Sequence, residues 1–139
     1  MRCLGLDLGT KTLGLALSDK SNTIASPYRV LRWNGENYDL LFKDLDMIID
    51  NNGITNLVLG LPKNMNNTLG FAAERSLKFK KALEKRYNLG VTLIDERLST
   101  VEATNYLLDA DMSRKKRKKV VDGVAASIIL DTYLKMKGE

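Results

Sequence analysis

The sequence predicts an α/β fold, a five-stranded mixed sheet flanked by helices. Three strand-like segments open the chain, and amphipathic helices then alternate with two further apolar strands. The chain has 139 residues without a repeat, a low-complexity run or a linker, so we expect one domain over residues 1–139. This order of elements favours a central position for the first strand, with Asp7 near its carboxyl end.

The first two strands form a predicted β-hairpin. Residues 2–8, RCLGLDL, place leucines at every second position, and GTKT provides a turn into a second strand over residues 13–19. A third strand is expected within residues 22–33, where Pro27 indicates a sheet edge or a bulge.

The remaining chain alternates helices and strands. Residues 37–51 carry Leu41, Leu45, Ile48 and Ile49 at the spacing of an amphipathic helix. The elements expected after it are a strand over 55–62, a helix over 69–87 with Ala72, Phe79 and Leu83 inward, a strand over 90–100, a helix from Ser99 or Thr100 to Leu108, and a last helix over 118–136.

The residues that are absent restrict the chemistry. The chain has no histidine and only one cysteine, Cys3, which excludes a Ser-His-Asp triad, an internal disulfide and a zinc site built on imidazole. Catalysis would therefore rest on carboxylates, lysine or tyrosine. No run of 18 apolar residues and no signal-peptide pattern are present, so we expect a cytoplasmic protein that does not enter a membrane.

The positive charge is concentrated in one segment. The net charge is +5, and RKKRKK at residues 114–119 carries six positive charges, which leaves the rest of the chain at −1. A solvated loop is one interpretation of this run, and contact with phosphates is the other. We expect the segment to be mobile and to precede the last helix.

Several acidic residues occur where a buried strand or helix should end. Asp7 lies on one strand face with Cys3 and Gly5, where the N–H groups of the following turn could also satisfy it. Asp95 and Glu96 end the strand VTLI and point to opposite faces. In the last helix Asp122 lies at the margin of a predicted apolar stripe, whose members are Val121, Val124, Ala125, Ile128 and Thr132.

Carboxylates brought together in this way would repel one another unless a divalent cation neutralises them. Carboxylate oxygens suit Mg²⁺ or Mn²⁺, and two such ions stabilise the attacking water and the leaving oxygen of a phosphodiester displacement. The residues thus indicate a metal site that contains Asp7, Asp122 and either Asp95 or Glu96.

The ordered motifs GLDLGTKTLGLALSD, LVLGLP, DERLST and VVDGVAASIIL resemble the YqgF/RuvX family over essentially the whole chain. The resemblance implies an RNase H-like fold, kinship with the Holliday-junction resolvase RuvC, and a nuclease that processes the pre-16S rRNA end. It assigns Asp7, Glu96 and Asp122 as catalytic and metal-binding residues, with Asp95 as the alternative if the strand register shifts by one. The chain departs from the family at Thr12, where arginine is common.

Basic residues near the expected strand ends are predicted to bind phosphate. Lys11, Lys63 and Arg97 each follow a strand that should end at the same rim as Asp7. In the basic segment, the predicted nucleic-acid contacts are Arg114, Lys115, Lys116 and Arg117.

Three other functions compete with an rRNA nuclease. The motif DLGT also occurs in sugar-kinase-type ATPases, but these enclose nucleotide between two duplicated domains and this chain has one. A Holliday-junction resolvase acting on branched DNA and a non-catalytic RNA-binding assembly factor remain open. The expected partners are precursor rRNA or branched DNA and the small ribosomal subunit, with the protein a monomer or a homodimer.

Overall fold

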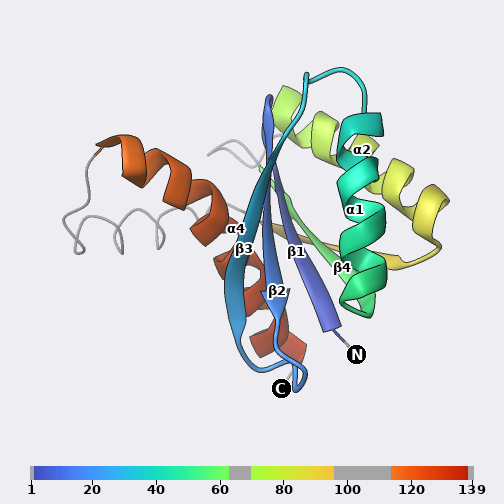
Figure 1. Cartoon of the computed structure of the whole chain (residues 1–139), viewed down its shortest axis with the longest axis vertical. Helices are drawn as coiled ribbons and strands as arrows, with labels where there is room; N and C mark the ends of the chain where they lie inside the picture. Colours follow the sequence, from blue (N-terminus) through green and yellow to red (C-terminus); the bar gives the residue numbers. More distant parts are fainter. Residues whose placement is uncertain (1, 63–69, 96–113, 138–139) are drawn as a thin grey trace.

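The computed structural model describes residues 2–62, 70–95 and 114–137, the last range without the side chains of 114–123. The sheet lies between α4 on one face and α1 with α2 on the other, as Figure 1 shows. The predicted α/β class is confirmed. The elements are β1 (Arg2–Leu8), β2 (Thr12–Ser18), β3 (Ala25–Arg32), α1 (Asp39–Asn51), β4 (Ile54–Leu61), α2 (Phe71–Tyr87), β5 (Gly90–Asp95) and α4 (Arg114–Lys137).

The sheet is mixed, and its strand order is β3-β2-β1-β4-β5. The strand β1 runs antiparallel to β2 and parallel to β4, which in turn is parallel to β5. The predicted central position of β1 is therefore confirmed. The strands β1, β3, β4 and β5 all end at one side of the sheet, which we call the carboxyl edge, and open α/β sheets bind ligands beyond such an edge.

The strand β3 is the outer strand next to β2, and it contains Pro27. Its register shifts between Leu15, which pairs with Arg29, and Ala16, which pairs with Pro27. Proline lacks an N–H for the sheet ladder, so an edge strand with an irregular register tolerates it. The sequence prediction of an edge or a bulge is confirmed in both respects.

One core fills the space between the sheet and the helices α1 and α2. It is built from leucines of β1, β2 and β4 that alternate along each strand, since side chains on a strand point to opposite faces in turn. The helices contribute Leu41, Leu45 and Ile48 from α1 and Phe79 and Leu83 from α2. Phe79 and Leu83 are buried as predicted, but Ala72 is only half-buried and its neighbour Ala73 is buried in its place.

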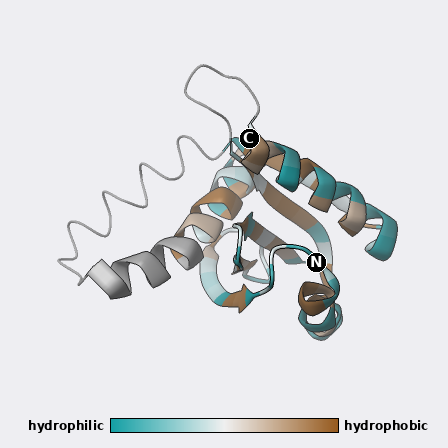
Figure 2. Cartoon of the chain, turned by 90° about the horizontal axis from the view of Figure 1, so that it is seen from above, coloured by the Kyte–Doolittle hydropathy of each residue, from teal (hydrophilic) through white to brown (hydrophobic). Residues whose placement is uncertain are grey.

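The second core lies between the opposite face of the sheet and α4. It joins small and branched strand residues, among them Cys3, Ala16 and Val58, to one apolar face of α4. Figure 2 shows apolar stretches of the helices turned toward the sheet and polar stretches turned outward. The residues that α4 contributes to this core are Ala126, Ile129, Leu130, Tyr133 and Leu134.

This arrangement corrects the predicted stripe on the last helix. Val124 and Ala125 are buried as expected, but Ile128 and Thr132 are only half-buried, whereas Ala126 is fully buried. Hydrophobic residues occur around most of this helix, so periodicity alone did not identify the face that meets the sheet. Close packing against Gly5 of β1 decides which face of α4 meets the sheet.

The helix α4 also begins earlier than predicted. It starts at Arg114 rather than at residue 118, so the segment 114–119 is part of the helix backbone and does not precede it. The mobility of this segment stays a prediction. Lysine and arginine are good helix formers, and a helix already nucleated by its packed part extends at low cost. The expected helix from residue 99 to 108 lies outside the described residues, as does the part of the fifth strand beyond Asp95.

Within the described ranges, none of the helices has the length and apolar character needed to cross a membrane.

Candidate catalytic site

Asp7 lies where β1 reaches the carboxyl edge. It is the penultimate residue of the central strand, pairs in register with Gly14 of β2, and its side chain is half-buried. Glycine directly opposite leaves space on the sheet surface beside the carboxylate. The position of Asp7 near the end of a central strand is as predicted, and its chemical role stays a prediction.

The carboxylate of Asp7 is on the face of the sheet that α4 covers. Asp7 shares this face with Cys3 and Gly5 by alternation. A Cβ atom added to Gly5 would lie 2.8 Å from the Leu130 Cβ and 2.9 Å from the Ala126 carbonyl oxygen. The helix therefore rests on the backbone of β1, two residues before Asp7.

A backbone hydrogen bond, and not a bond to the Asp7 carboxylate, closes the turn after Asp7. The Gly9 N–H donates to the Thr12 carbonyl over 2.8 Å, and no described residue donates a hydrogen bond to the Asp7 side chain. The turn N–H groups therefore do not satisfy Asp7, which was the structural alternative for this residue. A half-buried carboxylate without such bonds fits a cation.

A second set of bonds joins this turn to the segment after β3. The Trp33 N–H donates to the Lys11 carbonyl over 3.0 Å, and the Lys11 ammonium donates to the Asn34 carbonyl over 2.9 Å. The Trp33 indole N–H donates to the Gly9 carbonyl over 3.2 Å. Lys11 thus lies at the carboxyl edge close to Asp7 in the chain, and one of its three donors is already used.

Asp95 ends β5 at the same edge, in register with Leu61 of β4. By alternation, Asp95 is on the same face of the sheet as Val91 and Leu93, which pack against the core under α1 and α2. Ile94 belongs to the other core, under α4. Asp95 and Asp7 therefore lie on opposite faces of the sheet.

Asp122 is the ninth residue of α4 rather than a residue of its first turn, because the helix begins at Arg114. It precedes Ala126 by one turn, and Ala126 is the residue that meets Gly5. Figure 1 shows α4 running antiparallel to β1, so the residues before Ala126 lie toward the carboxyl edge. The side chain of Asp122 lies outside the described part of the chain.

The side chains of the other predicted site residues also lie outside the described part of the chain. Glu96, Arg97 and Lys63 are not among the described residues, and Arg114 to Arg117 are described as helix backbone only. Within the described residues, no group of three carboxylates or thiols is close enough to hold a metal ion. The described part of the site consists of Asp7, the turn that follows it and the backbone of α4.

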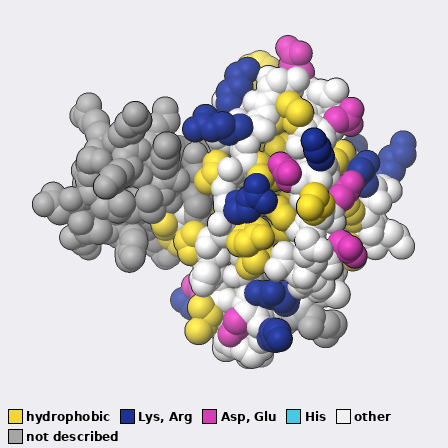
Figure 3. All heavy atoms as spheres, in the orientation of Figure 1, with side chains coloured by type: hydrophobic (Ala, Val, Ile, Leu, Met, Phe, Trp, Pro, Cys, Tyr) yellow, Lys and Arg dark blue, Asp and Glu magenta, His cyan; other side chains and the backbone are white. Residues whose placement is uncertain are grey.

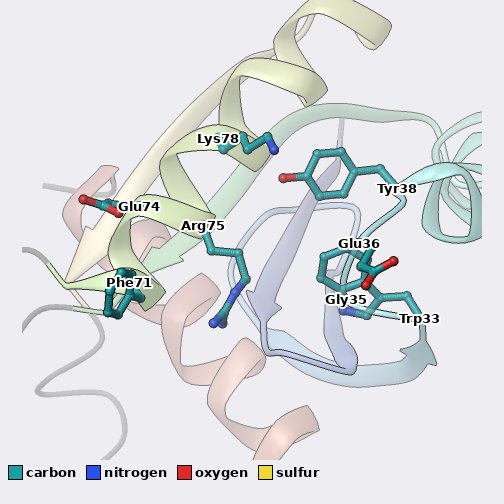
Figure 4. A pocket seen from close by; sticks show the side chains of 8 residues that line it. All are labelled: Trp33, Gly35, Glu36, Tyr38, Phe71, Glu74, Arg75 and Lys78. Atoms are coloured by element: carbon teal, nitrogen blue, oxygen red, sulfur yellow. The ribbon is translucent and has the colours of Figure 1, made fainter.

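The structure also shows a cavity at the carboxyl edge that sequence reasoning missed. It measures about 320 Å³ and lies between α2 and the segment that joins β3 to α1, as Figure 4 shows. Its residues come from two distant parts of the sequence, and no short motif indicates them. They are Trp33, Gly35, Glu36, Tyr38, Phe71, Glu74, Arg75 and Lys78.

Comparison with known proteins identifies the family. A family model described as "RuvX: Holliday junction resolvase" matches residues 1–136. The chain belongs to the RuvX family. A RuvX relative from Geobacillus kaustophilus, named "Putative pre-16S rRNA nuclease", is 50% identical over 137 residues, which are 99% of each chain. A Bacillus subtilis relative with the same name is 49% identical over 134 residues, or 96% of this chain and 97% of its own.

Solved structures support the RNase H-like fold of this RuvX chain. The structure titled "T. thermophilus RuvC in complex with Holliday junction substrate" aligns with a TM-score of 0.60 at 12% identity, over 99% of this chain and 96% of that one. At this identity the likeness concerns the fold. The predicted fold class and the family resemblance are both confirmed.

Proposed function

We propose that the protein is an endonuclease that hydrolyses phosphodiester bonds with a divalent metal ion, and that it processes the end of pre-16S rRNA. Relatives that share about half of its sequence are named "Putative pre-16S rRNA nuclease". The observation that carries the proposal is Asp7, a half-buried carboxylate at the end of the central strand, facing α4. Its action would take place in the cytoplasm, on the assembling small ribosomal subunit, as a monomer or a homodimer.

The surroundings of Asp7 fit a metal ligand. Glycines stand opposite and two residues before it, and no described hydrogen-bond donor neutralises its charge. We assign Asp7, Glu96 and Asp122 as ligands, since carboxylate oxygens suit Mg²⁺ or Mn²⁺. When bound, the ion supplies Lewis-acid polarisation of the phosphodiester and lowers the pKa of the attacking water. The chain has no histidine to act as a base instead.

Alternation along β5 supports Glu96 over Asp95 as a ligand. Asp95 lies on the face of Val91 and Leu93, opposite to that of Asp7. A residue that continues the strand by one position would share the face of Ile94, which is the face that α4 covers. The proposal therefore keeps Glu96 and excludes Asp95.

Binding of the nucleic acid is assigned to basic residues. Lys11 lies on the turn after Asp7, and its ammonium keeps two donors beyond its bond to Asn34. Figure 3 shows Lys and Arg interspersed with Asp and Glu over the described part of one face, so a phosphate backbone would meet individual cations there. The further proposed contacts are Lys63, Arg97, Arg114, Lys115, Lys116 and Arg117.

Branched DNA is the second candidate substrate. The family description names a Holliday junction resolvase, and a RuvC with the same fold was solved with such a junction. Both substrates present phosphates along a backbone that is not a straight duplex. A direct comparison of the two substrates decides between them.

The test is a cleavage assay with the purified protein on an RNA that spans the unprocessed 16S end and on a four-way DNA junction. Each is incubated with Mg²⁺, Mn²⁺ or EDTA, and Asp7→Asn is the matched variant. We expect cut RNA only with metal, no product from Asp7→Asn, and similar RNA affinity for both proteins. Asn keeps the size of the side chain but removes its charge.

Two outcomes would contradict the proposal. Cleavage by Asp7→Asn at the wild-type rate, or cleavage unaffected by EDTA, would exclude the metal site. Tight RNA binding without cleavage under any metal would instead support a non-catalytic assembly factor.

A further inference from the structure

The cavity at the carboxyl edge combines an aromatic wall with two cations, Arg75 and Lys78. The Trp33 and Tyr38 rings stack with centroids 5.5 Å apart, and Tyr38 also contacts Phe79 of the core at 5.1 Å. This wall is thus fixed from behind by the core. Figure 4 shows Arg75 and Lys78 extending from α2 into the space in front of it.

Arg75 and Lys78 form no ion pair or hydrogen bond with any residue that the structure describes. Other cations nearby on α2 differ, since Lys80 pairs with Glu84 and Arg86 with Asp46. Lys78 points toward the Tyr38 hydroxyl in Figure 4. Burial raises the pKa of Tyr38 although Arg75 acts in the opposite direction, so this hydroxyl stays protonated and can donate a hydrogen bond.

The cavity is joined directly to the turn that follows Asp7. Gly35, which has φ +82°, lies so close to the turn that an added Cβ would be 2.7 Å from the Thr10 carbonyl oxygen. The same Cβ would be 3.8 Å from the Lys11 ammonium. Asp7 is three residues before Thr10, a span of at most about 11 Å of extended chain.

The side chains that line the cavity carry both negative and positive charges. Glu36 and Glu74 accompany Arg75 and Lys78, and Figure 4 shows Glu74 pointing away from Tyr38. A site for a bare anion would be mainly basic. A nucleotide suits this mixture better, since its phosphate binds cations whereas the N–H groups of its base bind a carboxylate such as that of Glu36. The volume of about 320 Å³ lies at the lower end of small-molecule sites and holds one such unit, not a duplex.

We propose that this cavity binds one unpaired nucleotide of the substrate strand close to the cleaved bond, with its phosphate between Arg75 and Lys78. This inference rests on the proposed nuclease function, because it places the strand across the carboxyl edge from the α4 face of Asp7 to the α2 side. The turn from Gly9 to Lys11 is the crossing point, and Lys11 stands between the two sites.

The single tryptophan provides an NMR signal that reports binding in the cavity. Trp33 is the only tryptophan of the chain and lines the cavity, so its indole N–H gives one NMR signal from this place. The experiment titrates the four nucleoside 5′-monophosphates, the matching nucleosides and inorganic phosphate into the full chain with EDTA present. We expect a saturable shift with at least one monophosphate, and weaker binding of its nucleoside and of phosphate alone.

Arg75→Ala and Lys78→Ala should each weaken the binding of that monophosphate roughly tenfold, since each removes a charged contact. Lys81→Ala is the control, because it removes an equal charge from an exposed position of α2 outside the cavity. No shift, equal binding by all variants, or equal binding of phosphate alone would overturn the proposal. The titration needs neither metal nor cleavage, so its failure is distinct from failure of the nuclease assay with Asp7→Asn.

Discussion

The indole N–H of Trp33 donates a hydrogen bond to the carbonyl oxygen of Gly9 over 3.2 Å, although 24 residues separate them in the chain. The Trp33 ring is almost fully buried, and the backbone N–H of the same residue donates to the Lys11 carbonyl. Trp33 therefore fixes the turn that follows Asp7 from the side of β3. The position of the candidate site depends on this distant residue.

Replacement of Trp33 by Phe should loosen this turn. Phe keeps an aromatic ring for stacking on Tyr38 but lacks the donor, so a partly buried carbonyl loses its partner. We expect a loss of about 1 kcal/mol in the free energy of unfolding, measured by urea denaturation, and slower cleavage. Replacement of Phe71, an exposed aromatic residue, by Ala is the control for stability. Unchanged stability and cleavage in Trp33→Phe would show that the bond does not hold the turn.

Gly5→Ala should disturb the packing of α4 on β1. The new Cβ would lie 2.8 Å from the Leu130 Cβ and 2.9 Å from the Ala126 carbonyl oxygen, and a backbone atom of a packed helix cannot move aside cheaply. Overpacking of this kind costs about 1–3 kcal/mol. The shift of α4 should also reduce cleavage, because Asp122 is on this helix. Thermal and urea unfolding measure the first effect.

Gly90→Ala is the matched control for Gly5→Ala. Gly90 also lies in a strand, but an added Cβ there has no heavy atom within 4 Å. We expect its stability to change by less than about 0.5 kcal/mol. Equal stability of the two variants would contradict the close approach of α4 to β1.

The ion pair between α1 and α2 should make stability depend on acid pH. The Arg86 guanidinium donates two hydrogen bonds to Asp46, at 2.9 and 2.6 Å, and the Tyr87 hydroxyl donates a third. These donors, Arg86 foremost, lower the pKa of Asp46 to about 2. Since the folded pKa is below the unfolded value of about 3.9, this stabilisation is complete above pH 4 and is lost as the pH falls toward 2.

Asp46→Asn should therefore be less stable than wild type at pH 6, and the difference should shrink between pH 4 and pH 2. The effect will be small because both partners are more than one-third exposed. Chemical denaturation at several pH values measures it, with Asp50→Asn, an exposed position of α1, as the control for loss of one charge. A difference that stays constant over this pH range would refute the assignment.

The two acidic residues at the end of β5 should respond differently to substitution. Glu96→Gln should abolish metal-dependent cleavage, whereas Asp95→Asn should retain most of it, because Asp95 lies on the sheet face away from Asp7. Metal titration followed by cleavage under single-turnover conditions separates the two. If Asp95→Asn is the inactive variant, the metal ligand is Asp95 and not Glu96.

The basic start of α4 should act through long-range charge. Changing Arg114, Lys115, Lys116 and Arg117 to Gln keeps a good helix former at each position of the helix. RNA affinity should fall strongly at low salt and much less at high salt, because released counterions drive this binding. Equal loss at every salt concentration would indicate a folding defect. The charge-matched control changes Lys20, Lys43, Lys81 and Lys85 to Gln.

The sequence specified most of the fold because local patterns and global packing agree. Alternating leucines in β1 and the helical spacing in α1 identify both elements to within two residues. Pro27 located the edge strand, since a proline cannot serve a central one. The first helical turns of α4 were missed because a run of like charges is typical of a solvated segment, and only the packed remainder of the helix supports them.

Part of the candidate site was also predictable from local sequence patterns. Asp7 stands out in the sequence as a charge in an apolar strand. Alternation predicted its face, and the order of the elements predicted its place near the carboxyl end of a central strand. The cavity of Trp33, Tyr38, Arg75 and Lys78 did not stand out, because its residues are ordinary in their own segments. An aromatic residue after a strand and two cations on a helix are both typical of solvated or packed positions.

By itself, the sequence determined most of the described elements, the face of β1 that carries Asp7 and the limits on the chemistry. Alternation, helical spacing and the absence of histidine are local properties of the chain. The tertiary structure alone decided which face of α4 meets the sheet. It also decided that Asp95 lies away from Asp7 and that α2 comes close enough to the segment after β3 to form a cavity. These features depend on contacts between distant residues, such as Gly5 with Ala126, and a contact of that kind is fixed only when whole elements pack.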